Sequence, residues 1–325
     1  MSLNKFVNAN LISSSSFIPA YQLLYEKYPN EFKRKLQWAQ KILKDCTTCP
    51  QECNVNRFED LGYCRIGEKV KVSSFFAHFG EEEILRGWNG SGTIFFNMCN
   101  LRCVFCQNFD ISQNDDPDAV ELDSEELAKV MIELQNRGVH NINLVSPDHV
   151  VPQILLAIDK AIPMGLKLPI VYNSNAFSSL ETLKILDGII DIYMPDFKFW
   201  SEEFSRRYLK NERYPEFAKN AIIEMYRQVG DIQLDEFGLA KRGLIVRHLI
   251  MPGFVEESKK ILDFLANISK RIYLNLMSQY RPYAKVLLRP DIYKEIYRTI
   301  TKEEYKEVVQ YAYRLGFEII DHDFI

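Results

Sequence analysis

The sequence predicts an α/β protein in which a mostly parallel sheet is covered by helices. Short apolar segments typical of buried strands alternate with amphipathic segments typical of helices between residues 92 and 277. The predicted strands are apolar on both faces, which is the pattern of strands buried in a parallel sheet. Right-handed crossovers then favour a closed barrel or a doubly wound sheet, and both gather ligands at the carboxyl ends of the strands.

The predicted elements form about six strand-then-helix units. Strands are expected at 92–97, 140–145, 168–173, 189–194, 243–250 and 271–277, and helices at 123–137, 150–162, 178–186, 202–229 and 255–268. Asp123 is expected to cap the first of these helices. Another amphipathic helix is expected at 30–45. We therefore expect a helical, cysteine-rich extension over residues 1–70, followed by the α/β unit with a C-terminal helical segment over residues 71–325.

Composition is that of a soluble globular protein with a sizeable core, because hydrophobic residues make up 47% and charged residues 26% of the chain. The net charge of −4 argues against a nucleic-acid binder that works by bulk electrostatics. No segment approaches the roughly 18 uninterrupted apolar residues of a membrane span. The N-terminal segment also lacks the apolar run of a signal peptide. We therefore expect a cytoplasmic protein, in which thiols stay reduced.

All seven cysteines lie between residues 46 and 106, and such clustering in a reducing compartment indicates metal binding more often than disulfides. Cys99, Cys103 and Cys106 have the spacing C-x3-C-x2-C and directly follow a predicted strand. A structural zinc ion usually takes four protein ligands, and an iron–sulfur cluster bound by four cysteines is fully ligated. Three thiolates would leave one iron of a [4Fe–4S] cluster open to chelate a small molecule.

The four upstream cysteines, Cys46, Cys49, Cys53 and Cys64, have the spacing C-x2-C-x3-C-x10-C. They can close a zinc site, which would stabilise a small subdomain without a core of its own. They can also hold a second, fully ligated iron–sulfur cluster that relays electrons to the first. Free thiols are the third interpretation. The sequence does not choose between zinc and iron–sulfur.

The segment CNLRCVFC at 99–106 resembles the cluster loop of the radical S-adenosylmethionine (SAM) superfamily, in which an aromatic residue such as Phe105 usually precedes the third cysteine. The resemblance runs from Cys46 to Pro282 through CTTCPQECNVNR, GYCRIG, NLVSPDHV, VYNSNAF, DIYMPDFKFW and NLMSQYRP. It is strongest to an uncharacterised branch related to the pyruvate formate-lyase activating enzymes.

This resemblance implies a partial TIM-type (β/α)6 barrel with parallel strands. It also implies that Cys99, Cys103 and Cys106 are the catalytic cluster ligands and that the open iron binds SAM. The reduced cluster would cleave SAM to a 5′-deoxyadenosyl radical, which abstracts hydrogen from the substrate. The protein would bind and orient these groups and exclude water.

Two strand ends are expected to contact SAM or the substrate. Ser146 and Asp148 stand where the superfamily has a Gly-Gly-Glu motif that meets the SAM amino group, so backbone carbonyls or Asp148 would replace it here. The other interpretation of Asp148 is a cap at a strand-to-helix turn. In the strand at 243–250 the resemblance favours Arg247 facing inward, which leaves His248 as a structural histidine.

Two further strand ends match the SAM carboxylate site of the activating enzymes. The resemblance implies that Asn173, Ser174 and Asp196 shape that site, partly through a bound monovalent cation, which prefers such oxygen ligands. Lys198 could face the SAM carboxylate as a point charge. The alternative is a surface ion pair between Asp196 and Lys198.

Two loop segments complete the predicted site. His78 lies close to the acidic run at 81–83, an arrangement that can support acid–base chemistry or be simply exposed. The Tyr280-Arg281 pair could bind an anionic or peptide substrate at the mouth of a cleft, or belong to a packed loop.

The leading hypothesis is a radical SAM oxidoreductase of the activating-enzyme type that abstracts hydrogen from a protein or peptide. Its expected partners are SAM and an electron donor such as flavodoxin or ferredoxin. The alternative is a non-catalytic iron–sulfur or zinc protein that serves as an electron carrier or metal-binding scaffold. A nucleic-acid-modifying enzyme stays open because radical SAM enzymes also modify RNA, although the sequence has no basic tract or stacking platform.

Overall fold

The computed structural model describes residues 10–114 and 116–322. The start of the segment on which the signal-peptide expectation rests, residues 1–9, lies outside the described residues, as do residues 323–325 of the predicted C-terminal segment. None of the described helices is both long and apolar enough to span a bilayer.

A parallel sheet forms the centre of the molecule. Its strands pair in the order β3 (Ser91–Phe96), β5 (Ile142–Val145), β6 (Ile170–Ser174), β7 (Ile192–Pro195), β9 (Ala240–Leu249), β10 (Tyr273–Met277) and β11 (Ile320–His322). The first six are the strands expected from the sequence, with ends shifted by a few residues. The short strand β11, which the sequence pattern did not reveal, extends the sheet beyond β10.

Antiparallel strands extend the sheet beyond β3, where β2 (Val70–His78) pairs with β3 and with β4 (Val120–Leu122). The short strand β8 (Gln233–Leu234) pairs antiparallel with the start of β9, and β1 (Asn10–Leu11) pairs parallel with β8. Among the described residues β4 and β11 do not pair with each other. The barrel is therefore partial, as predicted.

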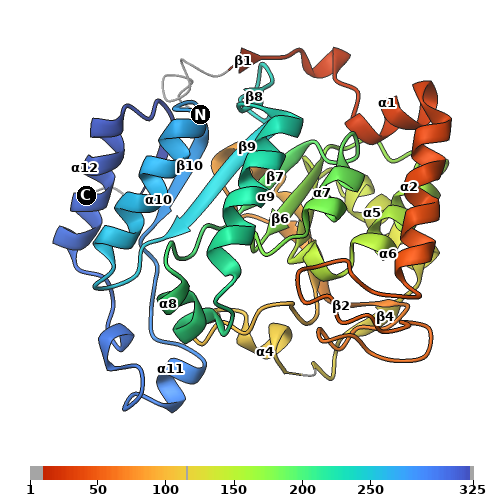
Figure 1. Ribbon diagram of the computed structural model, residues 1–325. Helices are drawn as coiled ribbons and strands as arrows, with labels where there is room; N and C mark the ends of the chain where they lie inside the picture. The colour runs from red at the N-terminus through yellow and green to blue at the C-terminus, as the bar shows by residue number, and fades with distance from the viewer. Residues whose placement is uncertain (1–9, 115, 323–325) are drawn as a thin grey trace.

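Helices cover the outside of this sheet (Figure 1). They are α1 (Ala20–Lys27), α2 (Pro29–Ile42), α5 (Ser124–Asn136), α6 (Val151–Ala161), α7 (Leu180–Leu186), α9 (Tyr214–Val229), α10 (Val255–Ile268) and α12 (Lys302–Leu315). Shorter helices are α3 (Glu83–Arg86), α4 (Phe109–Ser112), α8 (Glu202–Phe204) and α11 (Lys285–Leu288). The α5 helix has the predicted cap, because the Asp123 carboxylate accepts the backbone N–H groups of Glu125 and Glu126 at 2.9 Å.

Two predicted helices differ from expectation in their extent. The helix expected at 30–45 ends at Ile42, because the chain turns there and the Leu43 carbonyl accepts the Arg57 N–H at 2.7 Å. The segment expected to be helical over 202–229 is interrupted by a π-helical turn at Ser205–Leu209 and by Lys210, which has a left-handed φ of 62°. A new helix then starts at Tyr214 with Pro215 in its first turn, where the missing N–H of proline has no cost.

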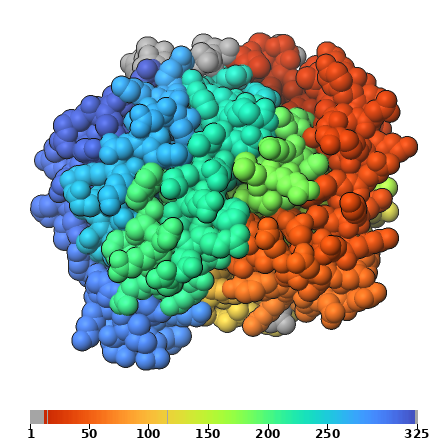
Figure 2. Space-filling model, viewed as in Figure 1, coloured from red at the N-terminus to blue at the C-terminus, as the bar shows by residue number. Residues whose placement is uncertain are grey.

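The N-terminal extension packs against the barrel and covers one side of the molecule, as the red and orange residues show in Figure 2. Its side chains Tyr21 and Phe32 share one buried cluster with the barrel strands and their helices. The ammonium group of Lys35 is buried and donates to the Ile185 carbonyl at 2.8 Å. The extension therefore shares the hydrophobic core of the barrel.

The short helix α3 closes the barrel at the amino-terminal ends of its strands. Ile84 and Leu85 of this helix are fully buried in one cluster with Val171, Met194, Ile245 and Tyr273. Each of these four residues lies two positions before a residue that lines a central cavity, so alternation places all four on the inner face of the sheet. The connection between β2 and β3 thus supplies an internal plug.

We expect Leu85→Ala to lower the free energy of unfolding by about 2–5 kcal/mol, because it leaves a void inside the closed end of the barrel. Denaturant unfolding of the two proteins measures the difference. The matched control is Leu288→Ala, since that side chain is 71% exposed. Equal losses in the two variants would contradict a plug role for α3.

Asp191 should make stability fall as pH rises. Burial raises the pKa of its carboxyl group to about 7, although the group accepts the backbone N–H groups of Ala20 and Ile170. Because the folded pKa lies above the ordinary value of 3.8, the stabilisation is present below pH 4 and is lost as pH rises through about 7. Relative to Asp191→Asn, the wild type should lose on the order of 4 kcal/mol across this range. Denaturant unfolding of both proteins at several pH values measures this loss. If the free energy of unfolding changes equally with pH in wild type and in Asp191→Asn, the assignment is refuted.

Candidate functional site

A cavity of about 820 Å³ opens at the carboxyl ends of the parallel strands. It brings together nearly all of the residues that the sequence singles out for the cluster and SAM. Those that line it are Cys99, Cys103, Phe105, Cys106, Ser146, Asn173, Ser174, Asp196, Lys198 and Arg247. Asp148 is the one cofactor-binding candidate that does not line it.

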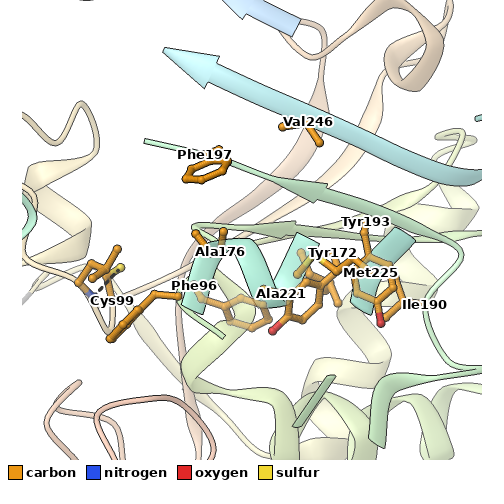
Figure 3. Close-up of a cluster of buried hydrophobic side chains, with 14 of the residues drawn as sticks. Phe96, Cys99, Tyr172, Ala176, Ile190, Tyr193, Phe197, Ala221, Met225 and Val246 are labelled. Carbon is orange, nitrogen blue, oxygen red and sulfur yellow. Dashed lines mark hydrogen bonds between the residues drawn. The ribbon is translucent and has the colours of Figure 1, made fainter. Parts of the chain in front are cut away.

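The loop after β3 holds the three cysteines against this cavity. Met98, with a left-handed φ of 68°, turns the chain away from the strand. Cys99 and Cys103 are 9% exposed and Cys106 is half-buried. Figure 3 shows Cys99 at one end of a row of buried side chains that continues through Phe96 toward Tyr193.

Polar groups of neighbouring residues reach two of the three sulfurs. The Asn175 side-chain amide donates to Cys99 Sγ at 3.3 Å, and the Leu101 N–H donates to the same sulfur at 3.4 Å. Cys106 Sγ and Ser112 Oγ lie 3.1 Å apart. Hydrogen bonds of this kind orient thiolate ligands and tune the potential of an iron–sulfur cluster. The sequence does not identify Asn175 as a sulfur partner, because that contact joins two loops 76 residues apart.

Burial disfavours the thiolate form of Cys99 and Cys103 in the absence of a metal centre. Burial raises the pKa of Cys99 to about 11, and burial also raises the pKa of Cys103 despite the nearby charge of Lys198. Since only thiolates ligate metal, binding of a metal centre here would release protons.

Within residues 10–114 and 116–322, no three His, Cys, Asp or Glu side chains converge as ligands of a single metal ion. The residues around the three thiols nevertheless fit an iron–sulfur cluster. All three thiols line one cavity, and the amide and hydroxyl groups described above contact the sulfurs of Cys99 and Cys106.

Phe105, within the cysteine loop, packs against two aromatic side chains of other loops. Its ring lies 6.1 Å from the rings of both Phe199 and Tyr280. Tyr280 is itself buried and donates to the Ile296 carbonyl at 2.8 Å, so it belongs to a packed loop and does not stand at the mouth of the cavity. Arg281 donates to Gln107 Oε1 at 3.2 Å. The Tyr-Arg pair is therefore not a joint substrate contact.

Asp196 and Lys198 face the cavity as a pair. Lys198 Nζ donates to Asp196 Oδ2 at 2.6 Å, and both side chains are largely buried. Burial lowers the pKa of Lys198, but the charge of Asp196 more than offsets this, so the net shift is upward and the group stays cationic. Asn173 and Ser174 line the same wall. The ion pair is therefore part of the cavity and is not on the outer surface.

Asp148 is turned away from the cavity into a buried hydrogen-bond network. It accepts the hydroxyl groups of Ser174 at 2.6 Å and of Ser178, and the Asn175 N–H at 3.2 Å. Burial raises the pKa of the carboxyl group against these bonds. Its visible role is to fix the 174–178 loop, and α6, the helix that follows, has no side-chain cap bond at its N-terminus.

Arg247 faces inward, as expected, but its partners are carboxylates of the β2–β3 connection. Its guanidinium donates to both carboxylate oxygens of Glu82 at 2.6 Å and also to Glu81. Asn275 donates to Glu82 at 2.7 Å. His78 Nδ1 lies 3.6 Å from Glu81. We call Glu81, Glu82 and Arg247 the floor triad, because they line the cavity at the end where α3 lies.

The glutamates of this triad were considered from the sequence only as a loop beside His78. The one available signal was three consecutive acidic residues just before a strand. His248 is structural, as expected, because it is buried and its two ring nitrogens contact the Phe197 carbonyl at 2.7 Å and Ser258 Oγ at 2.8 Å. Burial lowers the pKa of His248 to about 4.

The upstream cysteines gather in the loop between α2 and β2. Cys46, Cys49 and Cys64 are buried and Cys53 is partly exposed. Arg57 is 3% exposed and donates from Nε and Nη2 to Cys46 Sγ at 3.1 and 3.0 Å. The sequence indicated the four thiols but not the guanidinium among them.

Comparison with known proteins identifies the family. The family model described as the Radical SAM superfamily matches residues 93–265, which is more than half of the chain. An uncharacterised protein of Methanocaldococcus jannaschii, MJ0674, is 33% identical over 299 residues, which cover 90% of this chain and 81% of that protein.

Solved structures show weaker similarity. The [FeFe]-hydrogenase maturase HydG is 12% identical with a TM-score of 0.47, covering 93% of this chain and 65% of that one. Methylornithine synthase PylB is 13% identical with a TM-score of 0.45, covering 93% and 80%. For SuiB of Streptococcus suis the identity is 12% and the TM-score 0.45, and this chain spans about half of SuiB, 48% of its length. The family match together with the cysteine loop at the end of β3 shows that this chain belongs to the radical SAM superfamily, whose enzymes use a [4Fe–4S] cluster and SAM.

Proposed function

We propose that this protein binds a [4Fe–4S] cluster through Cys99, Cys103 and Cys106, cleaves SAM reductively, and abstracts hydrogen from a protein or peptide in the manner of the activating enzymes. The observation that carries the proposal is that the three cysteines line one cavity together with Lys198 and Asp196. When bound, the reduced cluster supplies one electron to SAM, and the resulting 5′-deoxyadenosyl radical abstracts hydrogen.

Different residues around the cavity would contact SAM, a monovalent cation and the cluster. Lys198 offers a fixed positive charge to the SAM carboxylate, and Ser146 offers its backbone carbonyl at the end of β5. Oxygen atoms of Asn173, Ser174 and Asp196 offer ligands to a monovalent cation beside that carboxylate. Asn175 orients the Cys99 sulfur. Phe105, packed against two other rings, keeps water from the cysteine loop.

The floor triad gives Arg247 a positioning role. Its charge is already shared between two carboxylates, so it holds the plug to β9 and β10 and is not free to bind an anion. The triad also leaves a net negative charge at this end of the cavity. The cofactor's carboxylate therefore belongs at Lys198, away from the floor.

Support for a peptide substrate comes from the rim of the cavity. Asn108 and Gln279 are exposed side chains that line it, whereas the Gln107 amide is already bonded to Phe105 and Arg281. The side-chain amides of Asn108 and Gln279 each offer both a donor and an acceptor, which matches the alternating N–H and C=O groups of a peptide backbone. The cavity volume of about 820 Å³ lies near the upper end of the usual range for ligand sites, so it has room for SAM and a substrate side chain.

The central test is SAM cleavage by protein reconstituted with iron and sulfide under anaerobic conditions. With dithionite and SAM, the wild type should form 5′-deoxyadenosine and methionine. The control is the Cys99→Ala/Cys103→Ala/Cys106→Ala variant, which should form none. Absence of product from wild-type protein that carries the full cluster would refute the proposed function. Tight binding of SAM, measured separately, would argue against the electron-carrier alternative, because a carrier has no use for it.

Lys198→Met should weaken SAM binding by about tenfold or more, because a charge-assisted contact to the carboxylate is lost. Equilibrium dialysis of the reconstituted protein measures the dissociation constant, with cluster content checked by absorbance. Lys306→Met removes an exposed lysine of α12 and serves as the matched control. Equal dissociation constants for the two variants would remove Lys198 from the SAM site.

A further inference from the structure

We infer that Cys46, Cys49, Cys53 and Cys64 hold a redox-active iron–sulfur cluster that passes electrons to the cluster at Cys99, Cys103 and Cys106. The electron transfer to the cavity cluster rests on the proposed function. The presence of the upstream cluster does not, because it does not depend on SAM chemistry.

The first argument is the charge at the centre of the upstream loop. The Arg57 guanidinium is buried, and its partners are Cys46 Sγ and the Ile66 carbonyl. Within the described part of the chain no carboxylate forms an ion pair with it. A buried cation is costly unless an anion faces it, and here the facing group is the Cys46 sulfur. A thiolate at this position supplies the negative charge, and the thiolate is the form in which cysteine ligates a metal centre.

The second argument is the architecture around the four sulfurs. Cys46, Cys49 and Cys64 are buried, whereas Cys53 lies partly at the surface. Gly62 packs close to this group, because a Cβ atom built on it would lie 3.4 Å from Cys53 Sγ and from the Arg57 guanidinium. Four thiols are the donor set that fully ligates a cubane cluster, and such a cluster serves electron transfer because no iron is left open.

The third argument separates an electron-transfer cluster from structural zinc. Asn100 lies in the loop that carries Cys99, Cys103 and Cys106, and its backbone carbonyl accepts a hydrogen bond from Gln51 Nε2 at 2.7 Å. Its side chain hydrogen-bonds the Cys49 thiol and contacts Cys99 Sγ at 3.8 Å. One asparagine therefore touches a cysteine of each group.

A second bridge joins the same two loops. Arg102, next to Cys103, donates to the Tyr63 carbonyl at 3.1 Å, and its guanidinium lies 4.9 Å from the centre of the Tyr63 ring. Tyr63 in turn precedes Cys64. Two cysteine groups that meet through two such bridges are placed for electron transfer, which structural zinc does not need.

The electron balance is simple. A low-potential one-electron donor of the ferredoxin or flavodoxin class is oxidised and reduces the upstream cluster. That cluster returns to its oxidised state by reducing the cluster in the cavity. The cluster in the cavity then gives the electron to the sulfonium of SAM. The carbon–sulfur bond of SAM breaks and yields methionine and the 5′-deoxyadenosyl radical. No proton moves in the relay itself.

The first experiment asks which metal the upstream site holds. In the Cys99→Ala/Cys103→Ala/Cys106→Ala variant, anaerobically reconstituted, we expect about four iron and four sulfide per chain and a paramagnetic signal after dithionite reduction. Zinc without iron, or no metal, would overturn the inference. The wild type provides a second measurement that does not depend on the variant folding. It should contain about eight iron, and its two reduced clusters should broaden each other's paramagnetic signals.

The second experiment tests the relay. The Cys49→Ala/Cys64→Ala variant is compared with wild type for 5′-deoxyadenosine formation driven by reduced flavodoxin and by dithionite. The ratio of flavodoxin-driven to dithionite-driven rates should fall about tenfold or more, because dithionite is small enough to reduce the cavity cluster directly. An unchanged ratio would overturn the relay. Iron at the upstream site combined with no product from wild type under either reductant would refute the proposed function and the relay, but not the upstream cluster.

Discussion

The floor triad determines the shape of the site. Arg247 on β9 binds both oxygens of Glu82 and also Glu81, and these carboxylates directly precede the helix that plugs the barrel. With both carboxylates largely buried, neither can leave the guanidinium without a large desolvation penalty. The plug is therefore fixed, and the space above it remains a cavity into which the sulfurs of the next connection face.

The loops that carry the two cysteine groups, Cys99 to Cys106 and Cys46 to Cys64, are in direct contact. The loop after β3 supplies the cavity wall, and the loop between α2 and β2 packs against its other side through Asn100 and Arg102. The extension also contributes to the barrel's own core, since Tyr21 and Phe32 belong to the same buried cluster as the strands. Family membership accounts for Cys99, Cys103 and Cys106, whereas the upstream cysteines belong to the extension outside the matched residues.

Buried polar networks around the site serve to hold loops. Asp148 secures the 174–178 loop through two serine hydroxyls and a backbone N–H, which in turn positions Asn175 against Cys99. His248 joins β9 to α10 through Ser258. These residues act on the cavity only through others, because their own polar atoms are fully used elsewhere.

The order of strands and helices and the cysteine loop were determined by the sequence alone, because apolar periodicity and cysteine spacing are local properties of the chain. The six parallel strands and the Asp123 cap follow from such patterns, whereas the inward face of Arg247 was expected only from the family resemblance. Only the tertiary structure revealed the α3 plug, the partners of Arg247, the direction in which Asp148 points and the contact of Arg57 with the upstream thiols. Some of these contacts join segments that are distant in the sequence, and others depend on the direction in which a side chain points. The spacing of residues in the sequence predicts neither of these features. Which polar group a buried charge meets depends on the folded path of the whole chain.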